Sequence, residues 1–194
     1  MQELRWRALL YVSVIRYLIT DGSAVRNEKR WLSHIALWME RGVEFVQIRE
    51  REMDARRLAE LTRKVVALPH GPAARILVND RADVAMAGGA DGVHLRDGSV
   101  FPALFARNGF VVSVACHDLL SVDLAEGADL ILLAPVFAPI SKPAGRPALG
   151  LNCLRRAVER TGIPVLALGG ITAENQQACL DAGAAGIAGI SFFC

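Results

Sequence analysis

Residues 74–95 read ARILVNDRADVAMAGGADGVHL, and they contain one complete strand–helix–strand unit. The apolar run at 74–79 is continuous and rich in Ile, Leu and Val, which is typical of a parallel strand buried on both faces. Residues 81–88 have the pattern of a helix, and a second apolar run follows at 92–95. Parallel strands need a crossover connection, usually a helix, so this stretch predicts a βαβ unit.

The same alternation extends outward over most of the chain. Apolar runs that predict strands occur at 14–20, 43–49, 74–79, 92–95, 111–116, 129–134, 164–168 and 186–190. Patterns that predict helices lie near 28–41, 54–67, 81–88, 101–107, 119–126, 150–161 and 173–182. Eight alternating strands favour an α/β fold in which residues 1–194 form a single (β/α)8 TIM barrel. An open, doubly wound sheet remains the alternative.

A weak internal repeat marks the points where a predicted helix gives way to the next strand. Its three copies are Gly89-Ala90-Asp91, Gly127-Ala128-Asp129 and Gly183-Ala184-Ala185. Glycine in this place can take the left-handed conformation that ends a helix. The repeat therefore indicates architecture and not chemistry.

The eighth predicted strand is followed almost at once by Phe192-Phe193-Cys194, so we expect the final helix to be short or absent. Phe192 and Phe193 would then leave an apolar patch unless something covers them. Segment 1–12, a partner, and a part of the chain that is missing are three alternatives that the sequence leaves open.

Composition excludes several classes of protein. The net charge of +2 gives no large basic field for nucleic acid. No uninterrupted apolar run reaches the roughly 18 residues of a membrane span. The cysteines are Cys116, Cys153, Cys179 and Cys194. They lack the C-x-x-C spacing of a zinc or redox site, which predicts free thiols and a cytoplasmic protein.

In a parallel barrel, the functional groups gather at the carboxyl ends of the strands. Polar and cationic side chains follow several predicted strands there, which favours an anionic ligand. Gly169 and Gly170 follow the seventh strand and lead into a predicted helix start near Ala173. Glycine lets backbone N–H groups approach a phosphate, and a helix N-terminus adds a favourable dipole. An ordinary tight turn is the alternative to a phosphate site.

Gln47, Arg49 and Arg51 alternate along the second strand, so their side chains leave the same face. Cations inside a barrel are costly unless an anion lies beside them. This pattern predicts that they bind a charged part of the ligand. The alternative places Arg51 in the following loop, where water solvates it.

Three further strand ends carry candidate chemistry. Asn79 and Asp80 end an apolar strand, and Asp80 is a candidate ligand of a divalent cation; its alternative role is to cap the helix at 81–88. His117 follows the fifth strand and is a candidate general acid or base, with a structural histidine as the alternative. His94 lies within the fourth strand, where we expect a role in the core or behind the site.

Seven short motifs, in order along almost the whole chain, resemble the thiamine phosphate synthase/TenI superfamily. They are YLITD (17–21), VQIRE (46–50), VNDR (78–81), ADGVHL (90–95), APVF (134–137), LGGI (168–171) and IS (190–191). Each motif is modest alone, but seven in order are specific at the level of the superfamily. The resemblance implies a TIM barrel that binds a thiazole phosphate.

In this superfamily the synthases join a pyrimidine diphosphate to a thiazole phosphate and expel pyrophosphate, and the TenI proteins include thiazole phosphate tautomerases. The residues that match the synthase pattern are Gln47, Arg49, Asn79, Asp80, Ser141, Lys142, Gly169, Gly170, Ile190 and Ser191. The departures are Arg51 for a lysine, Ser99 for the second magnesium aspartate (with Asp97 close by), Ala115 for a serine and Pro139 for a threonine.

The departures favour a TenI-like tautomerase, because they remove donors and charge that a pyrophosphate leaving group needs. His117 matches the TenI histidine that moves the proton, and Arg49 and Lys142 are its expected catalytic partners. The alternative is a synthase that needs Mg²⁺. In that case Asp80 and Asp97 would hold the metal, and Arg49, Arg51, Ser141 and Lys142 would bind pyrophosphate. A non-catalytic sensor of a phosphate ligand is a further alternative, and a homo-oligomer also stays open.

Overall fold

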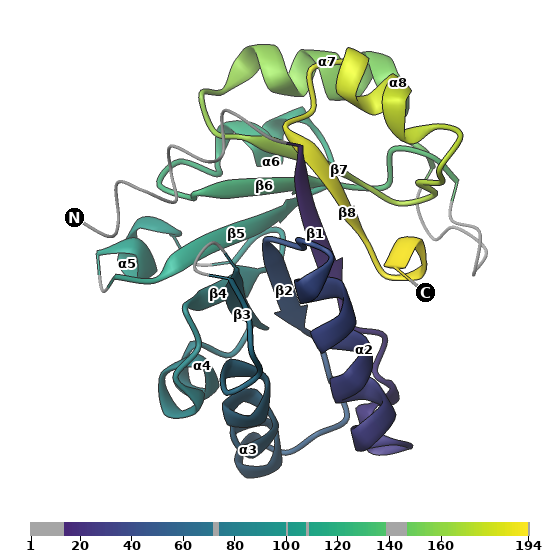
Figure 1. The fold of residues 1–194 in the computed structure, drawn as a ribbon. Coiled ribbons are helices and arrows are strands. Elements are labelled where there is room, and N and C mark those ends of the chain that lie inside the picture. Colours follow the sequence, from purple (N-terminus) through teal and green to yellow (C-terminus); the bar gives the residue numbers. More distant parts are fainter. Residues whose placement is uncertain (1–13, 72–73, 100, 108, 139–146, 194) are drawn as a thin grey trace.

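The structure, a computed structural model, describes residues 14–71, 74–99, 101–107, 109–138 and 147–193. Within these residues, eight parallel strands close into one barrel in the order β1-β2-β3-β4-β5-β6-β7-β8 (Figure 1). The circle closes at β1, where Leu18 lies opposite Val46 of β2 on one side and Gly189 of β8 on the other. The predicted TIM barrel is therefore confirmed, and the open sheet is excluded.

Every strand lies inside the range that the apolar pattern predicts for it. The strands are β1 (Ile15–Ile19), β2 (Phe45–Ile48), β3 (Arg75–Asn79), β4 (Gly92–Leu95), β5 (Val111–Cys116), β6 (Leu130–Leu133), β7 (Val165–Leu168) and β8 (Gly186–Gly189). The helices are α2 (Glu28–Glu40), α3 (Ala55–Val66), α4 (Ala82–Gly88), α5 (Ala103–Ala106), α6 (Leu119–Asp123), α7 (Gly150–Arg160) and α8 (Gln176–Asp181), and the 3-10 helices are η1 (Ser23–Val25) and η2 (Ser191–Phe193).

The barrel interior and its outer layer are packed separately. Tyr17, Phe45, Leu77, Leu132 and Leu166 belong to a cluster of inward-facing side chains from alternating strand positions. The opposite faces of the strands pack against the helices in two further clusters. Figure 1 shows α7 and α8 on one side of the barrel and α2, α3 and α4 on the other. Because both faces of each strand are buried, the strands are continuous apolar runs in the sequence.

The repeated Gly-Ala-Asp segments act as the sequence predicts. Their glycines all have left-handed backbone conformations, with φ of 72° at Gly89, 86° at Gly127 and 94° at Gly183. The aspartates tie neighbouring strands together, because Asp91 and Asp129 each accept a 2.8 Å hydrogen bond from the backbone amide of the strand beside them. The repeat is therefore a structural device at the helix-to-strand junctions.

The chain after β8 folds back against α2. Among the described residues, η2 follows β8 and no α-helix follows η2. Phe193 is fully buried, and its ring meets the Trp38 ring edge-on with 5.1 Å between the centroids. Trp38 of α2 therefore covers part of Phe193, and the three alternatives for what covers β8 and Phe192 stay predictions. Residues 1–12 lie outside the described residues.

Two expectations about composition can be compared with the described residues. None of the described helices is long and apolar enough to span a bilayer. Cys116, Cys153 and Cys179 are free thiols, and Cys194 is not among the described residues.

Candidate functional site

A cavity of about 610 Å³ opens at the carboxyl ends of the strands. The predicted site residues that line it are Gln47, Arg49, Arg51, Asn79, Asp80, His117 and Ile190. They come from β2, β3, β5 and β8 and from the loops that directly follow these strands. A neighbouring cavity of about 420 Å³ lies along α2 and shares Ile19 and Ile190 with the first. Because the first cavity holds most of the predicted polar residues, we take it as the candidate site.

Four arginines line this cavity: Arg81 and Arg96, and the pair Arg49 and Arg51 that follows β2. Arg49 is half-buried, and its pKa is lowered chiefly by burial and then by the nearby charge of Arg51. Arg51 is exposed in the turn after β2, as the loop alternative predicts, yet it still lines the cavity. An anion between the two guanidinium groups would offset both the burial and the repulsion.

Arg49 is held in place by a buried network that the sequence analysis missed. Its backbone amide donates to the hydroxyl oxygen of Thr20 at 2.8 Å. That hydroxyl donates to one oxygen of Glu50 at 2.8 Å, and the amide of Ala24 donates to the other at 3.2 Å. Glu50 is only 3% exposed. The only signal in the sequence is a glutamate placed directly after an apolar strand.

Replacing Glu50 with Gln should lower the free energy of unfolding by about 1–3 kcal/mol, the usual cost of leaving one buried donor without an acceptor. The amide oxygen of Gln can accept from Thr20 or from Ala24, while the carboxylate accepts from both. Urea unfolding measures the loss, and Glu52→Gln, at an exposed position in the same loop, is the matched control. Equal stability of the two variants would contradict a structural role for the Glu50 carboxylate.

Gln47 presents an unused acceptor at the wall of the cavity. Its side chain is 1% exposed, and its Nε2 donates to Oδ1 of Asn79 at 2.8 Å. Among the described residues, the Oε1 atom of Gln47 has no hydrogen-bond partner. A buried acceptor without a partner is costly, so this oxygen is a strong candidate for a bond from a donor on the ligand.

Asp80 does not have the capping role that the sequence left open. It is the only described non-glycine residue with positive φ, at 56°. Its Oδ1 accepts from the backbone amide of Arg96 at 3.0 Å, and its Oδ2 lies 3.3 Å from Nδ2 of Asn79. The N-cap residue of α4 is Arg81, and no described side chain forms a capping hydrogen bond at this end of the helix. The alternative of an Asp80 cap is therefore wrong.

Only part of the predicted magnesium site faces the cavity. The described residues contain no group of three or more His, Cys, Asp or Glu side chains that could hold a metal ion. Asp80 lines the cavity, but the described lining does not include Asp97 from the loop after β4, so their joint action stays a prediction. Mg²⁺ in phosphate sites is often held by one or two carboxylates together with substrate phosphates and water. The donor set therefore fits a Mg²⁺ that is shared with a diphosphate, and it does not fit a metal held by protein groups alone.

His117 is held in one orientation at the edge of the cavity. Its Nδ1 lies 2.6 Å from the carbonyl oxygen of Ala134. Because a carbonyl only accepts, we assign the proton to Nδ1, and the neutral ring then keeps its lone pair on Nε2. The geometry is that of a base with one fixed nitrogen and one available nitrogen.

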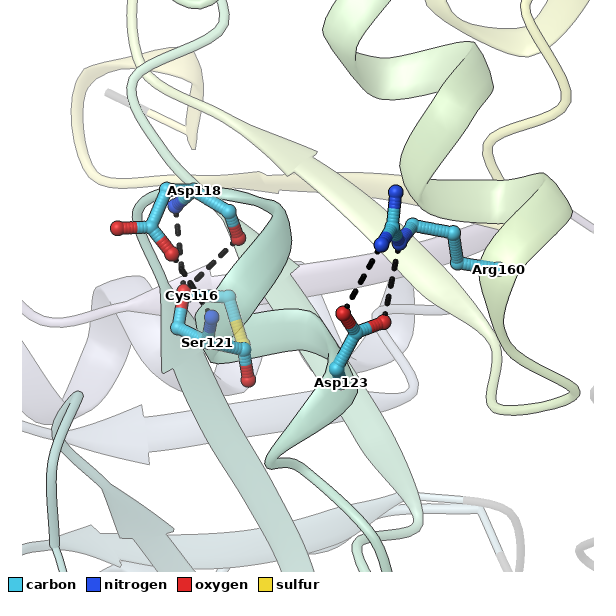
Figure 2. A network of polar contacts seen from close by, with 5 residues as sticks. All are labelled: Cys116, Asp118, Ser121, Asp123 and Arg160. Atoms are coloured by element: carbon cyan, nitrogen blue, oxygen red, sulfur yellow. Dashed lines mark hydrogen bonds and ion pairs between the residues drawn. The ribbon is translucent and has the colours of Figure 1, made fainter.

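The segment that follows His117 is fixed by a capping box at the start of α6 (Figure 2). Asp118 Oδ1 accepts from the amide of Ser121 at 2.7 Å, and the Ser121 hydroxyl oxygen accepts from the amides of His117 and Asp118. At the other end of α6, Asp123 forms an ion pair with Arg160 of α7, as Figure 2 also shows. These contacts tie the loop that carries His117 to the outer helices.

His94 also lines the cavity, although the sequence favoured a place in the core or behind the site. It is 7% exposed, and burial, followed by the charge of Arg49, lowers its pKa to about 3. The ring is therefore neutral at physiological pH. His94 belongs to the wall of the cavity and not to the interior layer below it.

The ends of β7 and β8 lie side by side, as a phosphate site between them requires. Leu168 pairs with Ala188, so Gly169-Gly170 and Ile190-Ser191 follow adjacent strand ends. Gly169 and Gly170 have φ of 94° and 63°, and a Cβ at Gly170 would lie 2.4 Å from the carbonyl oxygen of Ala138. No described residue accepts a hydrogen bond from the amide of Gly169 or Gly170. Both amides remain candidate donors to a phosphate.

The helix that was predicted to begin near Ala173 starts later. α8 begins at Gln176, and Asn175 forms a turn before it by accepting from the amide of Thr172 and donating to the carbonyl of Gly170, both at 2.8 Å. The prediction of a helix N-terminus directly behind the glycine turn is therefore wrong. A phosphate in this place would depend on the loop amides instead.

Three predicted positions lie outside the described residues. They are Ser141 and Lys142, the expected diphosphate ligands, and Pro139, one of the departures from the synthase pattern. Their roles stay predictions.

Comparison with known proteins gives consistent names. The family model described as thiamine monophosphate synthase matches residues 16–193. A relative from Aquifex aeolicus, provisionally named thiamine-phosphate synthase 2, is 41% identical over 181 residues, which cover 91% of this chain and 96% of that protein. The thiamine-phosphate synthase of Archaeoglobus fulgidus is 37% identical over 184 residues, with coverage of 93% and 85%. The structure of thiamine phosphate pyrophosphorylase from Pyrococcus furiosus has 30% identity and a TM-score of 0.78, with coverage of 97% and 88%.

Proposed function

Because this chain belongs to the thiamine monophosphate synthase family of thiamine biosynthesis, we propose that it is a thiamine-phosphate synthase, which joins a pyrimidine diphosphate to a thiazole phosphate. The substitutions at Arg51, Ser99 and Ala115 favour a TenI-like tautomerase when the sequence is considered alone. The named relatives favour the synthase, and the tautomerase becomes the second candidate.

The observation that carries the proposal is the grouping of Arg49, Arg51 and Asp80 at the cavity that Gln47 also lines. Arg49 and Arg51 together with the Asp80 carboxylate suit a diphosphate with its magnesium ion, and Arg81 and Arg96 add positive charge to the same lining. The unused oxygen of Gln47 suits a donor on an uncharged ring. A thiazole phosphate alone has one phosphate group, for which the β7 and β8 loops already offer amides. A second anion site is what a synthase needs and a tautomerase does not.

In the proposed reaction, the bond between the pyrimidine methylene carbon and the diphosphate oxygen breaks, and both electrons leave with pyrophosphate. The thiazole ring nitrogen donates its lone pair to the methylene carbon and forms the new C–N bond. Arg49 and Arg51 stabilise the charge that grows on the departing pyrophosphate, with Ser141 and Lys142 as expected partners. Bound Mg²⁺ would neutralise part of the same charge, and Asp80 would hold it.

The remaining residues position the two rings. Gln47 and Asn79, joined at 2.8 Å, orient the pyrimidine through its ring substituents. Gly169, Gly170 and Ser191 hold the phosphate of the thiazole near the β7 and β8 ends. The two substrates then meet across the mouth of the barrel, where orientation alone contributes much of the rate.

The direct test supplies purified protein with the pyrimidine diphosphate, the thiazole phosphate and Mg²⁺. We expect thiamine phosphate and pyrophosphate to form in equal amounts, and chelation of the metal by EDTA to stop the reaction. Interconversion of thiazole tautomers without either product would support the tautomerase and overturn the synthase.

The orientation of His117 is the observation that favours the second candidate, because its Nε2 is available as a base. Under the synthase proposal, His117→Gln should lower kcat for thiamine phosphate formation by less than about tenfold, since no proton transfer by this ring is required. Under the tautomerase alternative, the same variant should lose about 100-fold or more of its proton exchange on the thiazole. Exchange followed in deuterated water, beside the synthase assay, separates the two.

A further inference from the structure

A chain of three hydrogen-bonding side chains runs through the barrel interior and ends at the cavity. Tyr17 of β1, which is fully buried, lies with its hydroxyl oxygen 2.8 Å from the hydroxyl oxygen of Ser113 of β5. The same Ser113 oxygen lies 2.9 Å from Nδ1 of His94 of β4. His94 and Ser113 are direct neighbours in the β4–β5 register. None of the proposed chemistry above uses Tyr17 or Ser113.

Satisfaction of the buried groups fixes the direction of this chain. A buried Tyr hydroxyl has to donate its proton, and Ser113 is its only hydrogen-bond partner among the described residues. The oxygen of Ser113 therefore accepts from Tyr17, and its own proton goes to Nδ1 of His94. The opposite direction would leave the Tyr17 proton without an acceptor in the fully buried layer, which is costly.

We propose that Tyr17 and Ser113 hold His94 as a neutral imidazole with its proton on Nε2, so that His94 donates a hydrogen bond to an uncharged acceptor atom of the ligand, such as a heteroaromatic ring nitrogen. Nε2 has no partner among the described residues, and His94 lines the cavity. The inference deepens the proposed function and rests on it for the identity of the ligand.

The electrostatic surroundings keep the ring neutral. Burial, and then the charge of Arg49 at the same cavity, lowers the pKa of His94 to about 3. Tyr17 is also kept protonated, because burial raises its pKa well above the usual range. The hydrogen-bond chain fixes the tautomer by its geometry, and the directions of both pKa shifts agree with a fixed donor.

The two histidines of the cavity are thus held in opposite tautomers. The carbonyl of Ala134 places the proton of His117 on Nδ1, which leaves Nε2 as an acceptor. The hydroxyl of Ser113 donates to Nδ1 of His94 in the proposed chain, so the proton of His94 lies on Nε2 and this atom is a donor. Together with the unused oxygen of Gln47, the cavity offers the ligand one fixed donor and one fixed acceptor from β4 and β2. This pattern selects a heterocycle that carries an acceptor nitrogen beside a donor group.

Long-range ¹H–¹⁵N correlation spectra of uniformly labelled, full-length protein test the tautomer directly. The His94 signals are assigned by their loss in His94→Gln. We expect the pattern of a neutral ring protonated on Nε2 at about pH 8. A neutral ring protonated on Nδ1 would overturn the proposal. This measurement uses no ligand, so it stands apart from the proposed function.

Tyr17→Phe keeps the ring and removes only the first donor of the chain. We expect a second His94 population with the proton on Nδ1, because that tautomer then no longer leaves a buried Tyr17 proton without an acceptor. Ile15→Val, on the same inward face of β1, removes a methyl group and no polar atom, and should leave the tautomer unchanged. Equal tautomer populations in Tyr17→Phe and wild type would contradict control by Tyr17, and the wild-type spectrum remains decisive if the variant does not fold.

Thiamine phosphate is the probe for the ligand contact. Its titration should shift the Nε2–H proton of His94 in the wild type, and its Kd should rise about tenfold in Tyr17→Phe, a loss typical of one hydrogen bond. Binding measured by calorimetry without any shift of the His94 signal would overturn the contact. No binding at all, with the tautomer as expected, would contradict the proposed function instead.

Discussion

Replacing Asp80 with Asn should lower kcat for thiamine phosphate formation by at least about 100-fold, which corresponds to roughly 3 kcal/mol of transition-state stabilisation. The substitution keeps the shape of the side chain and removes its charge. The amide oxygen can still accept from the backbone of Arg96, which the carboxylate does at 3.0 Å. The fold around β3 is therefore expected to survive while the hold on a magnesium–diphosphate pair is lost.

Asp181→Asn is the matched control, since Asp181 is exposed at the end of α8, where its Oδ1 accepts from Nε2 of Gln177 at 2.9 Å. Its kcat should equal that of the wild type. The apparent affinity for Mg²⁺, measured by the dependence of rate on metal concentration, should fall in Asp80→Asn alone. A kcat within threefold of the wild type in Asp80→Asn would remove Asp80 from the metal site.

Arg49→Ala is expected to show the second large effect, a loss of kcat/KM for the pyrimidine diphosphate of about 100-fold to 1,000-fold. Arg49 is half-buried, and both its desolvation and the neighbouring charge of Arg51 lower its pKa. A guanidinium that is partly desolvated and repelled by a neighbour contributes most to binding when an anion lies beside it. The thiazole phosphate KM should change little, because its phosphate is expected at the β7 and β8 ends.

The free energy of unfolding of Arg49→Ala is a second measurement, and it is not expected to fall as the activity does. Removing a half-buried cation should leave the free energy of unfolding unchanged or raise it by up to about 1 kcal/mol. Arg56→Ala, whose side chain is 90% exposed on α3, should change neither kinetics nor stability. Lower stability in Arg49→Ala with unchanged kinetics would mean that Arg49 serves the fold and not the ligand.

The strands could be predicted almost fully from the sequence, while the helices could be predicted only in part. Each strand of a parallel barrel is buried on both faces, so its apolar run ends where the strand ends. Helix ends depend on local hydrogen bonds as well. Near residue 173 the pattern predicts a helix, but the side chain of Asn175 bonds to Thr172 and Gly170 and forms a turn there instead.

The grouping of Gln47, Arg49, Asn79 and His117 could also be predicted, because closure of the barrel brings the carboxyl ends of all strands to one mouth. What could not be predicted depends on contacts between distant strands. The burial of Glu50 beneath Thr20, the contact of Asp80 with the amide of Arg96 and the hydrogen bond between Ser113 and His94 join residues far apart in the chain. Nothing in the spacing of the sequence encodes such pairs.

A crystal structure of the protein with thiamine phosphate, pyrophosphate and Mg²⁺ tests the central claim most directly. We predict the thiamine phosphate across the mouth of the barrel, with its pyrimidine beside Gln47, its phosphate on the amides of Gly169 and Gly170, and pyrophosphate between Arg49 and Arg51. Thiamine phosphate bound along α2, or a mouth that stays empty at saturating ligand, would contradict the account.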